Sequence, residues 1–209
     1  MYKSKTEYNN LYLYDDDATA TIEFSMVFPI IVLLGLMLID FTFHFSTESK
    51  LARLSNSMSS VIRERSSLYA ASDVIKSEDV ESIKKVVDVL LGSDTLKGSV
   101  GVRVQAIYFS DASSKNNKIV DSSKTVDIYV SGSLNPVDKD KCSGHYNMTS
   151  TNVLNMSPWM KTSDSEGKWA PLYQLTLCTK GRDSLFKNAL AGVGVIAETL
   201  STSNIVIPR

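Results

Sequence analysis

The sequence predicts an α+β protein, in which a long N-terminal helix precedes one small globular domain with an antiparallel sheet. Two observations favour this class. An uncharged stretch at 24–39 leads into apolar residues at helical spacing, and later segments alternate apolar and polar residues as strands do. About 160 residues remain once the N-terminal residues 1–18 and the apolar stretch are set aside, which is enough for one soluble domain.

Residues 24–45 are predicted to cross a membrane. This stretch of roughly 22 residues would extend about 33 Å as a helix, and a bilayer core is about 30 Å thick. Pro29 should kink the helix or weaken one hydrogen bond, which membrane helices tolerate. Glu23 stands at the leading edge of the stretch, where a carboxylate beside an apolar helix needs a partner.

The helical pattern continues beyond the apolar stretch. Apolar residues recur at helical spacing at Leu51, Leu54, Met58, Val61, Ile62, Leu68 and Tyr69. We therefore expect one long helix over residues 19–71, with its first half in the membrane. Its second half is amphipathic and would pack on the soluble domain or on neighbouring subunits.

Residues 1–18 are predicted to be a leader and not a folded element. They are polar and end in the acidic run 15–17, and the small residues at 18–21 lie before the apolar stretch. An ordinary secretory signal has its cleavage site after the apolar run. A cut at the small residues would instead leave the helix on the mature protein.

The segment 18–24, Ala-Thr-Ala-Thr-Ile-Glu-Phe, resembles the processing motif of prepilins of the type IV pilus superfamily. It is similar to the motif of the minor pseudopilins TadE and TadF of the Tad (Flp-type) branch. A cut between Ala18 and Thr19 makes Glu23 the fifth mature residue and Phe24 the sixth, as in that family, although Ala18 stands where most members have glycine. The segments 169–178 and 203–209 also resemble TadF more than TadE.

The resemblance implies a pilus assembly protein that a prepilin peptidase cuts after Ala18 and that supports adherence and biofilm formation. Its implied partners are other Tad pilins and pseudopilins, the inner-membrane platform proteins and the secretion ATPase. The amine freed at Thr19 and the Glu23 carboxylate could neutralise each other, within one chain or between neighbours, so Glu23 and Phe24 are the predicted filament-registration residues. The helix would lie in the bacterial inner membrane, with a periplasmic domain at 72–209.

The charges that flank the apolar stretch disagree with this orientation. Basic residues lie on both sides, at Lys3 and Lys5 before it and at Lys50, Arg53, Arg63 and Arg65 after it. By the positive-inside rule this distribution places the C-terminal side in the cytoplasm. The prepilin-like motif and the cysteine pair favour an external domain, and we follow the motif.

Within the domain, residues 77–92 are predicted to form a second helix that Ser77 caps and Gly92 ends. The alternating segments 100–109 and 125–131 predict an antiparallel hairpin, in which Val102, Val104, Ala106 and Tyr108 share one side. Three further elements are expected, namely a strand at 172–180, a short helix at 183–191 and a last strand at 203–207.

Residues 135–171 are expected to form a long loop, and connections of this length are usually functional or locally stapled. Cys142 in this loop and Cys178 in the following strand could form a disulfide in an oxidising compartment, or remain two separate thiols. An exported domain favours the bridge, which would close about 37 residues and contribute about 4 kcal/mol.

The composition gives little support to other classes of function. With 22 Lys and Arg against 23 Asp and Glu, the chain has no basic excess for binding nucleic acid. The only histidines, His44 and His145, are too few for a metal cluster, and no cofactor is expected. No GxSxG, HExxH, P-loop or GxGxxG motif has a suitable context, so an enzyme is not expected.

The main alternative to a pilus protein is a signal-anchored periplasmic binding or sensor domain. In that case the match at residues 18–23 is accidental, no cleavage occurs, and Glu23→Ala leaves function intact. A membrane-anchored hydrolase is a third hypothesis. Full function after mutation of His145 would exclude it.

Overall fold

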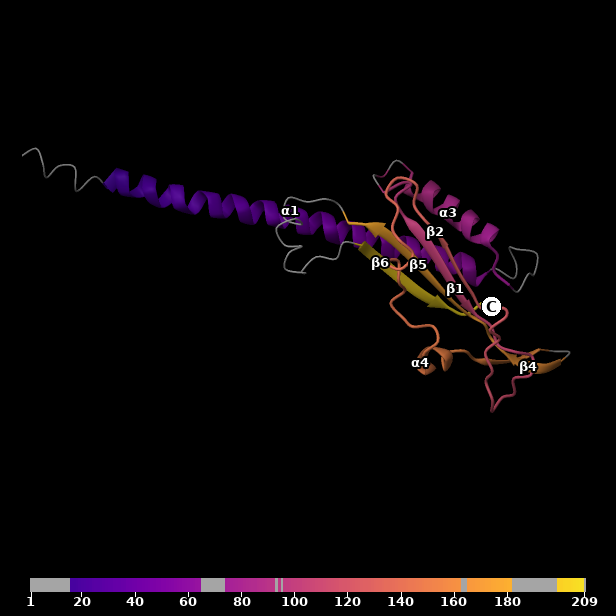
Figure 1. The fold of residues 1–209 in the computed structure, drawn as a ribbon. Helices are drawn as coiled ribbons and strands as arrows, with labels where there is room; N and C mark the ends of the chain where they lie inside the picture. The colour runs from indigo at the N-terminus through magenta and orange to yellow at the C-terminus, as the bar shows by residue number, and fades with distance from the viewer. Residues whose placement is uncertain are drawn as a thin grey trace, which may run out of the picture. The chain divides into compact units, whose positions relative to one another are not determined.

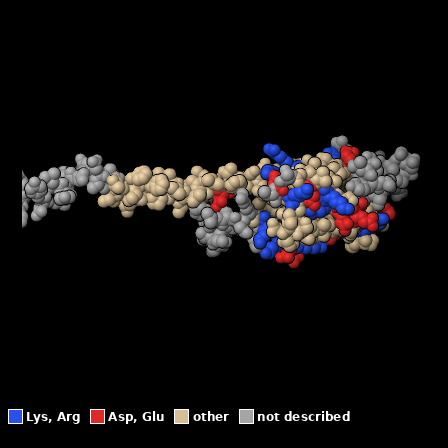
Figure 2. All heavy atoms as spheres, turned by 90° about the horizontal axis from the view of Figure 1, so that it is seen from above, with Lys and Arg blue, Asp and Glu red and all other residues tan. Residues whose placement is uncertain are grey.

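The computed structural model describes residues 16–64, 74–92, 94, 96–162, 165–181 and 199–208. It has the predicted architecture, a long N-terminal helix and a domain with an antiparallel sheet (Figure 1). The chain separates into two compact units, Met1–Phe43 and His44–Arg209. Charged side chains gather over the second unit, whereas the described surface of the first is almost uncharged (Figure 2).

Helix α1 runs from Asp16 to Arg63 and supplies both units. It begins earlier than predicted, because the acidic run at 15–17 suits the positive end of a helix dipole. The last residues of the expected leader are therefore helical. Helix α1 ends at Arg63, whereas the prediction extended the helix to Ala71. Residues 65–73 themselves lie outside the described part of the chain.

Four antiparallel strands form the central sheet, in the order β2-β1-β5-β6. Their bounds are Gly101–Ile107 for β1, Val126–Val130 for β2, Leu172–Lys180 for β5 and Thr199–Val206 for β6. The predicted hairpin of β1 and β2 and the predicted strand β5 are confirmed. Strand β6 begins at Thr199, ahead of the predicted Ser203.

The second half of α1 and helix α3 (Ser77–Leu91) cover one face of the sheet, which we call the core face. The apolar side chains buried there include Leu51, Met58, Ile62, Val80, Ile83, Val87, Val102, Val104, Ala106, Tyr108, Leu175 and Leu177. The predicted alternation along β1 is thus confirmed. Burial of this apolar surface is the main force that holds the second unit together.

Both ends of α3 are defined by local hydrogen bonds. The Asp79 carboxylate accepts the backbone N–H of Lys76 at 2.9 Å, so Lys76 is the N-cap and the prediction of Ser77 was wrong. Ser77 is therefore the first residue of the helix, and the acid at the third helical position binds the backbone of the residue before the helix. The helix ends at Gly92, whose φ of 54° favours glycine, as predicted.

The segment 135–171 is not one continuous loop, which corrects the prediction. It contains the short helix α4 (Thr151–Leu154) and a hairpin of β3 (Trp159–Thr162) and β4 (Ser165–Trp169). The hairpin pairs only with itself in the described sheets and carries few apolar residues, so its sequence shows no clear alternation. The predicted helix at 183–191 lies outside the described residues.

Candidate functional site

The predicted processing residues lie at the start of α1. The peptide bond between Ala18 and Thr19 follows Asp16, the first helical residue, within one turn. The first four N–H groups of a helix have no intrahelical acceptor, and helix ends fray readily. The backbone around this bond can therefore become extended, as a peptidase substrate must be, while the apolar part of the helix stays helical.

Glu23 and Phe24 lie on the exposed surface of α1. The side chain of Phe24 is 67% exposed, and its ring stacks on that of Phe28 one turn later, with centroids 5.5 Å apart. Within the described part of the chain, no ion pair engages the carboxylate of Glu23. The structure therefore places an acidic side chain where the apolar surface of the helix begins.

The helix surface that follows is apolar and uncovered. The exposed large apolar side chains between Ile22 and Ile39 have exposed fractions of 43–69%. The hydroxyl groups of Ser25 and Thr42 donate to backbone carbonyls of the same helix at 2.8 Å each, which satisfies these donors internally. Soluble monomers rarely expose a contiguous apolar surface of this size, and the helix is long and apolar enough to cross a membrane.

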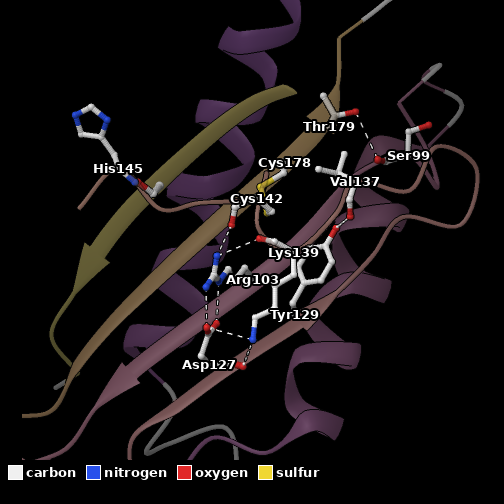
Figure 3. Close-up of a disulfide and its surroundings, with 11 residues drawn as sticks. Ser99, Arg103, Asp127, Tyr129, Val137, Lys139, Cys142, His145, Cys178 and Thr179 are labelled. Carbon is white, nitrogen blue, oxygen red and sulfur yellow. Dashed lines mark hydrogen bonds and ion pairs between the residues drawn. A yellow bond between two sulfur atoms is a disulfide. The ribbon is translucent and has the colours of Figure 1, made fainter. Parts of the chain in front are cut away.

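The second candidate is the segment 137–146, here called the strap, which crosses the face of the sheet opposite the core face (Figure 3). At β2, the phenol of Tyr129 donates to the carbonyl of Val137. At β6, the hydroxyl of Ser203 accepts the backbone N–H of His145 at 2.8 Å. The strap thus reaches from one edge of the sheet to the other.

A disulfide joins the strap to β5 in the middle of this crossing. Cys142 and Cys178 are both fully buried, and their Cα atoms are 5.6 Å apart. Val137 is buried beside them. The bridge links residues separated by 36 positions, so it fixes the strap to a central strand.

Arg103 of β1 connects the strap to β2. Its Nε and Nη2 atoms donate to the two carboxylate oxygens of Asp127 at 2.8 and 2.7 Å. Its Nη1 atom donates to the carbonyls of Lys139 and Cys142 at 3.2 and 2.8 Å. The planar guanidinium can bind a carboxylate and two carbonyls at once because its donors form a rigid fork.

The protonation states around Arg103 are fixed at neutral pH. Hydrogen bonds from Arg103 lower the pKa of Asp127, and the same pairing raises the pKa of Arg103. Burial raises the pKa of Tyr129, because it disfavours the phenolate. The carboxylate, the guanidinium and the neutral phenol therefore serve as structural contacts for the strap.

A cluster around Lys118 was missed by sequence reasoning. The ammonium group donates to the carbonyls of Leu154 and Ser157 at 2.6 and 3.3 Å, and it lies 3.9 Å from the ring centroid of Trp169. Burial lowers the pKa of Lys118. This cation connects α4 to the β3–β4 hairpin, and no local pattern in the sequence marks such a distant set of contacts.

The two predicted sites belong to different units, since residues 18–24 lie in the first and both cysteines in the second. His145 is exposed, and its ring points away from the disulfide (Figure 3) and packs edge-on against Tyr146. In the described ranges, no group of three or more His, Cys, Asp and Glu side chains could hold a metal ion.

A protein-family model matches residues 14–209, nearly the whole chain. It is described as "Putative tight adherence pilin protein F" and abbreviated TadF. The matched region begins before Ala18, so it includes the predicted processing segment, the apolar helix and both cysteines. No curated protein and no solved structure matches the chain.

Proposed function

The chain belongs to the TadF family of tight adherence (Tad) pilus proteins, and we propose that it is a minor pseudopilin that supports assembly of a Tad (Flp-type) pilus. The observation that carries the proposal is the acidic residue Glu23, exposed at the start of an uncovered apolar helix. Packing such a helix among others in a membrane or filament leaves the carboxylate without water, and it then needs a cationic partner.

In this proposal, a prepilin peptidase supplies the cation by cutting between Ala18 and Thr19. The cut creates an ammonium group at Thr19, four residues before Glu23. Side chains of a helix tilt toward its N-terminus, so the carboxylate of Glu23 can reach the amine one turn earlier and the two groups can neutralise each other within one chain. They can equally pair between neighbouring subunits, which would set the register of the helices.

The proposed location is the bacterial inner membrane, with one span at 24–45 and a periplasmic domain at 72–209. The disulfide supports this side of the membrane, because disulfides persist in oxidising compartments. The proposed partners are the prepilin peptidase, the other Tad pilins and pseudopilins, and the inner-membrane platform proteins. The proposed outcome of assembly is adherence and biofilm formation, which is a structural role without catalysis.

Replacing Glu23 by glutamine in the chromosomal copy tests the proposal. Glu23→Gln keeps the size of the side chain but leaves the Thr19 amine without its anion, so we expect surface pili to fall by about tenfold or more. Glu48→Gln, at another exposed acid of α1, is the matched control and should leave piliation unchanged. The measurement is the amount of pilin sheared from cells at equal levels of this protein.

Wild-type piliation in the Glu23→Gln strain and in a deletion strain would contradict the proposal. A signal-anchored periplasmic binding or sensor domain would then be the better description.

A further inference from the structure

Two fully buried polar side chains of β5, Gln174 and Thr176, lie under the strap. Among the described residues, none provides a hydrogen-bond partner for either amide atom of Gln174 or for the hydroxyl of Thr176. The strap backbone rests directly on both at Gly144, where an added Cβ would lie 1.6 Å from Gln174 Nε2 and 3.2 Å from Thr176 Oγ1. The contact between strap and sheet therefore buries polar atoms without compensation.

These unsatisfied atoms oppose docking of the strap. A polar group that loses water without gaining a partner disfavours the buried state by about tenfold or more. Several contacts favour docking. They are the fork of Arg103, the phenol of Tyr129, the ion pair of Lys139 with Asp127, the hydrogen bond from the His145 N–H to Ser203 and the small apolar contact at Val137. The buried atoms without partners offset part of this gain, and the covalent bond adds a restraint that does not depend on the balance.

The remainder of the second unit does not depend on the strap. The large apolar cluster lies on the core face, where α1 and α3 pack. The chain is anchored before the strap by Leu134, whose N–H donates to the carbonyl of Gly98 at 3.0 Å. It is anchored after the strap by Met148, which is buried with Val153 and Leu172 in a second apolar cluster.

We propose that the Cys142–Cys178 disulfide is a redox latch on the strap. When a dithiol reductant transfers two electrons and two protons to the bridge, two thiols form and the reductant becomes a disulfide. Residues 137–146 then lift from the sheet, while the sheet and the helices on its core face stay folded. Opening exposes the polar strand surface of Arg103, Gln174 and Thr176 to water.

Limited proteolysis of the full chain in detergent micelles tests this latch. In Cys142→Ser/Cys178→Ser, trypsin should cleave after Lys139 and Lys141 at least about 30-fold faster than in the oxidised wild type, since a disulfide of this span restrains the chain strongly. Wild-type protein in dithiothreitol should give the same fragments. Cleavage after the exposed Lys115, outside the strap, is the internal control and should keep its rate.

Hydrogen exchange on the same samples distinguishes opening from unfolding. We expect the backbone amides of β1 and β5 to keep their protection in the double serine variant. Loss of that protection would show that the disulfide holds the whole domain, and an unchanged cleavage rate would show that the strap stays docked without it. Either result overturns the proposal.

A rescue variant tests the role of the buried polar atoms. Gln174→Met and Thr176→Val nearly preserve side-chain volume but remove the unsatisfied groups. Added to the double serine variant, they should slow cleavage in the strap by about tenfold or more. Unchanged or faster cleavage would contradict the claim that these groups oppose docking.

Discussion

At the scale of single residues, Arg103 of β1 links the strap to the sheet. It pairs with Asp127 of β2 and binds two carbonyls of the strap, and its side chain is only 14% exposed. A lysine has a compact ammonium group and cannot reproduce this fork of donors. The strap should therefore be sensitive to the shape of residue 103 as well as to its charge.

Arg103→Lys is expected to lower the free energy of unfolding of the domain by about 1–3 kcal/mol, because at least two charge-assisted hydrogen bonds are lost. Urea unfolding of the full chain in detergent, followed by circular dichroism, measures this change. The control is Lys124→Ala, which removes an exposed ion pair of 3.5 Å to Asp121 and should cost less than about 0.5 kcal/mol. Equal effects of the two substitutions would contradict the role given to Arg103.

The pairing with Arg103 also predicts a pH dependence. The pKa of Asp127 is lower in the folded state than in the unfolded chain, so its contribution to stability is fully present above the unfolded pKa. It is lost as the pH falls below about 4 and through the folded pKa. Urea unfolding at pH 7 and pH 3 should therefore show a smaller acid-induced loss for Asp127→Asn than for the wild type. An identical loss in both proteins would show that this pair does not contribute.

At the scale of elements, Lys118 connects the β3–β4 hairpin to α4. The chain has only two tryptophans, and Trp159 and Trp169 both lie in this hairpin, with ring centroids 5.2 Å apart. Tryptophan fluorescence is therefore a local probe of the cluster. Lys118→Met should shift the emission to the red and reduce stability by about 1–2 kcal/mol, because the carbonyls of Leu154 and Ser157 lose their charged donor.

The matched control for this prediction is Lys115→Met, at an exposed lysine of the preceding turn. It should leave the emission maximum unchanged. A red shift of the same size in both variants would mean that the ammonium of Lys118 does not hold the hairpin.

Elements with a regular apolar period could be predicted from the sequence. The alternation Val102, Val104 and Ala106 fixes β1, and the apolar stripe of α3 fixes the helix and its buried side. The irregular part could not be predicted, because its contacts join distant residues. The pairing of Arg103 with Asp127 requires the register of β1 and β2, and the contact of Gly144 with Gln174 requires the path of the strap.

The candidate sites show the same division. The processing segment is a continuous motif and stays a prediction from the sequence. The disulfide could be proposed because the two cysteines are the only ones in the chain. The buried polar pair under the strap could not, since Gln174 and Thr176 alternate with Tyr173 and Leu175 as in any strand with one apolar face. Only the structure shows that both faces of β5 are covered.

At the scale of the whole molecule, the two compact units differ in the polarity of their surfaces. The first is an apolar helix with little buried surface, and the second is a domain with its own core and a charged surface (Figure 2). This division suits a protein that is anchored in a membrane by its N-terminal helix. The family match extends over both units, so the anchor and the domain belong to one pilus protein.

The central claim is that Ala18 and Thr19 form a processing site, and the N-terminus of the mature protein tests it most directly. Protein purified from membranes of cells with and without the prepilin peptidase should be sequenced from its N-terminus. We predict a chain that starts at Thr19 when the peptidase is present and at Met1 when it is absent. Retention of Met1 in both strains would contradict the account, because Glu23 would then lack the amine with which it is proposed to pair.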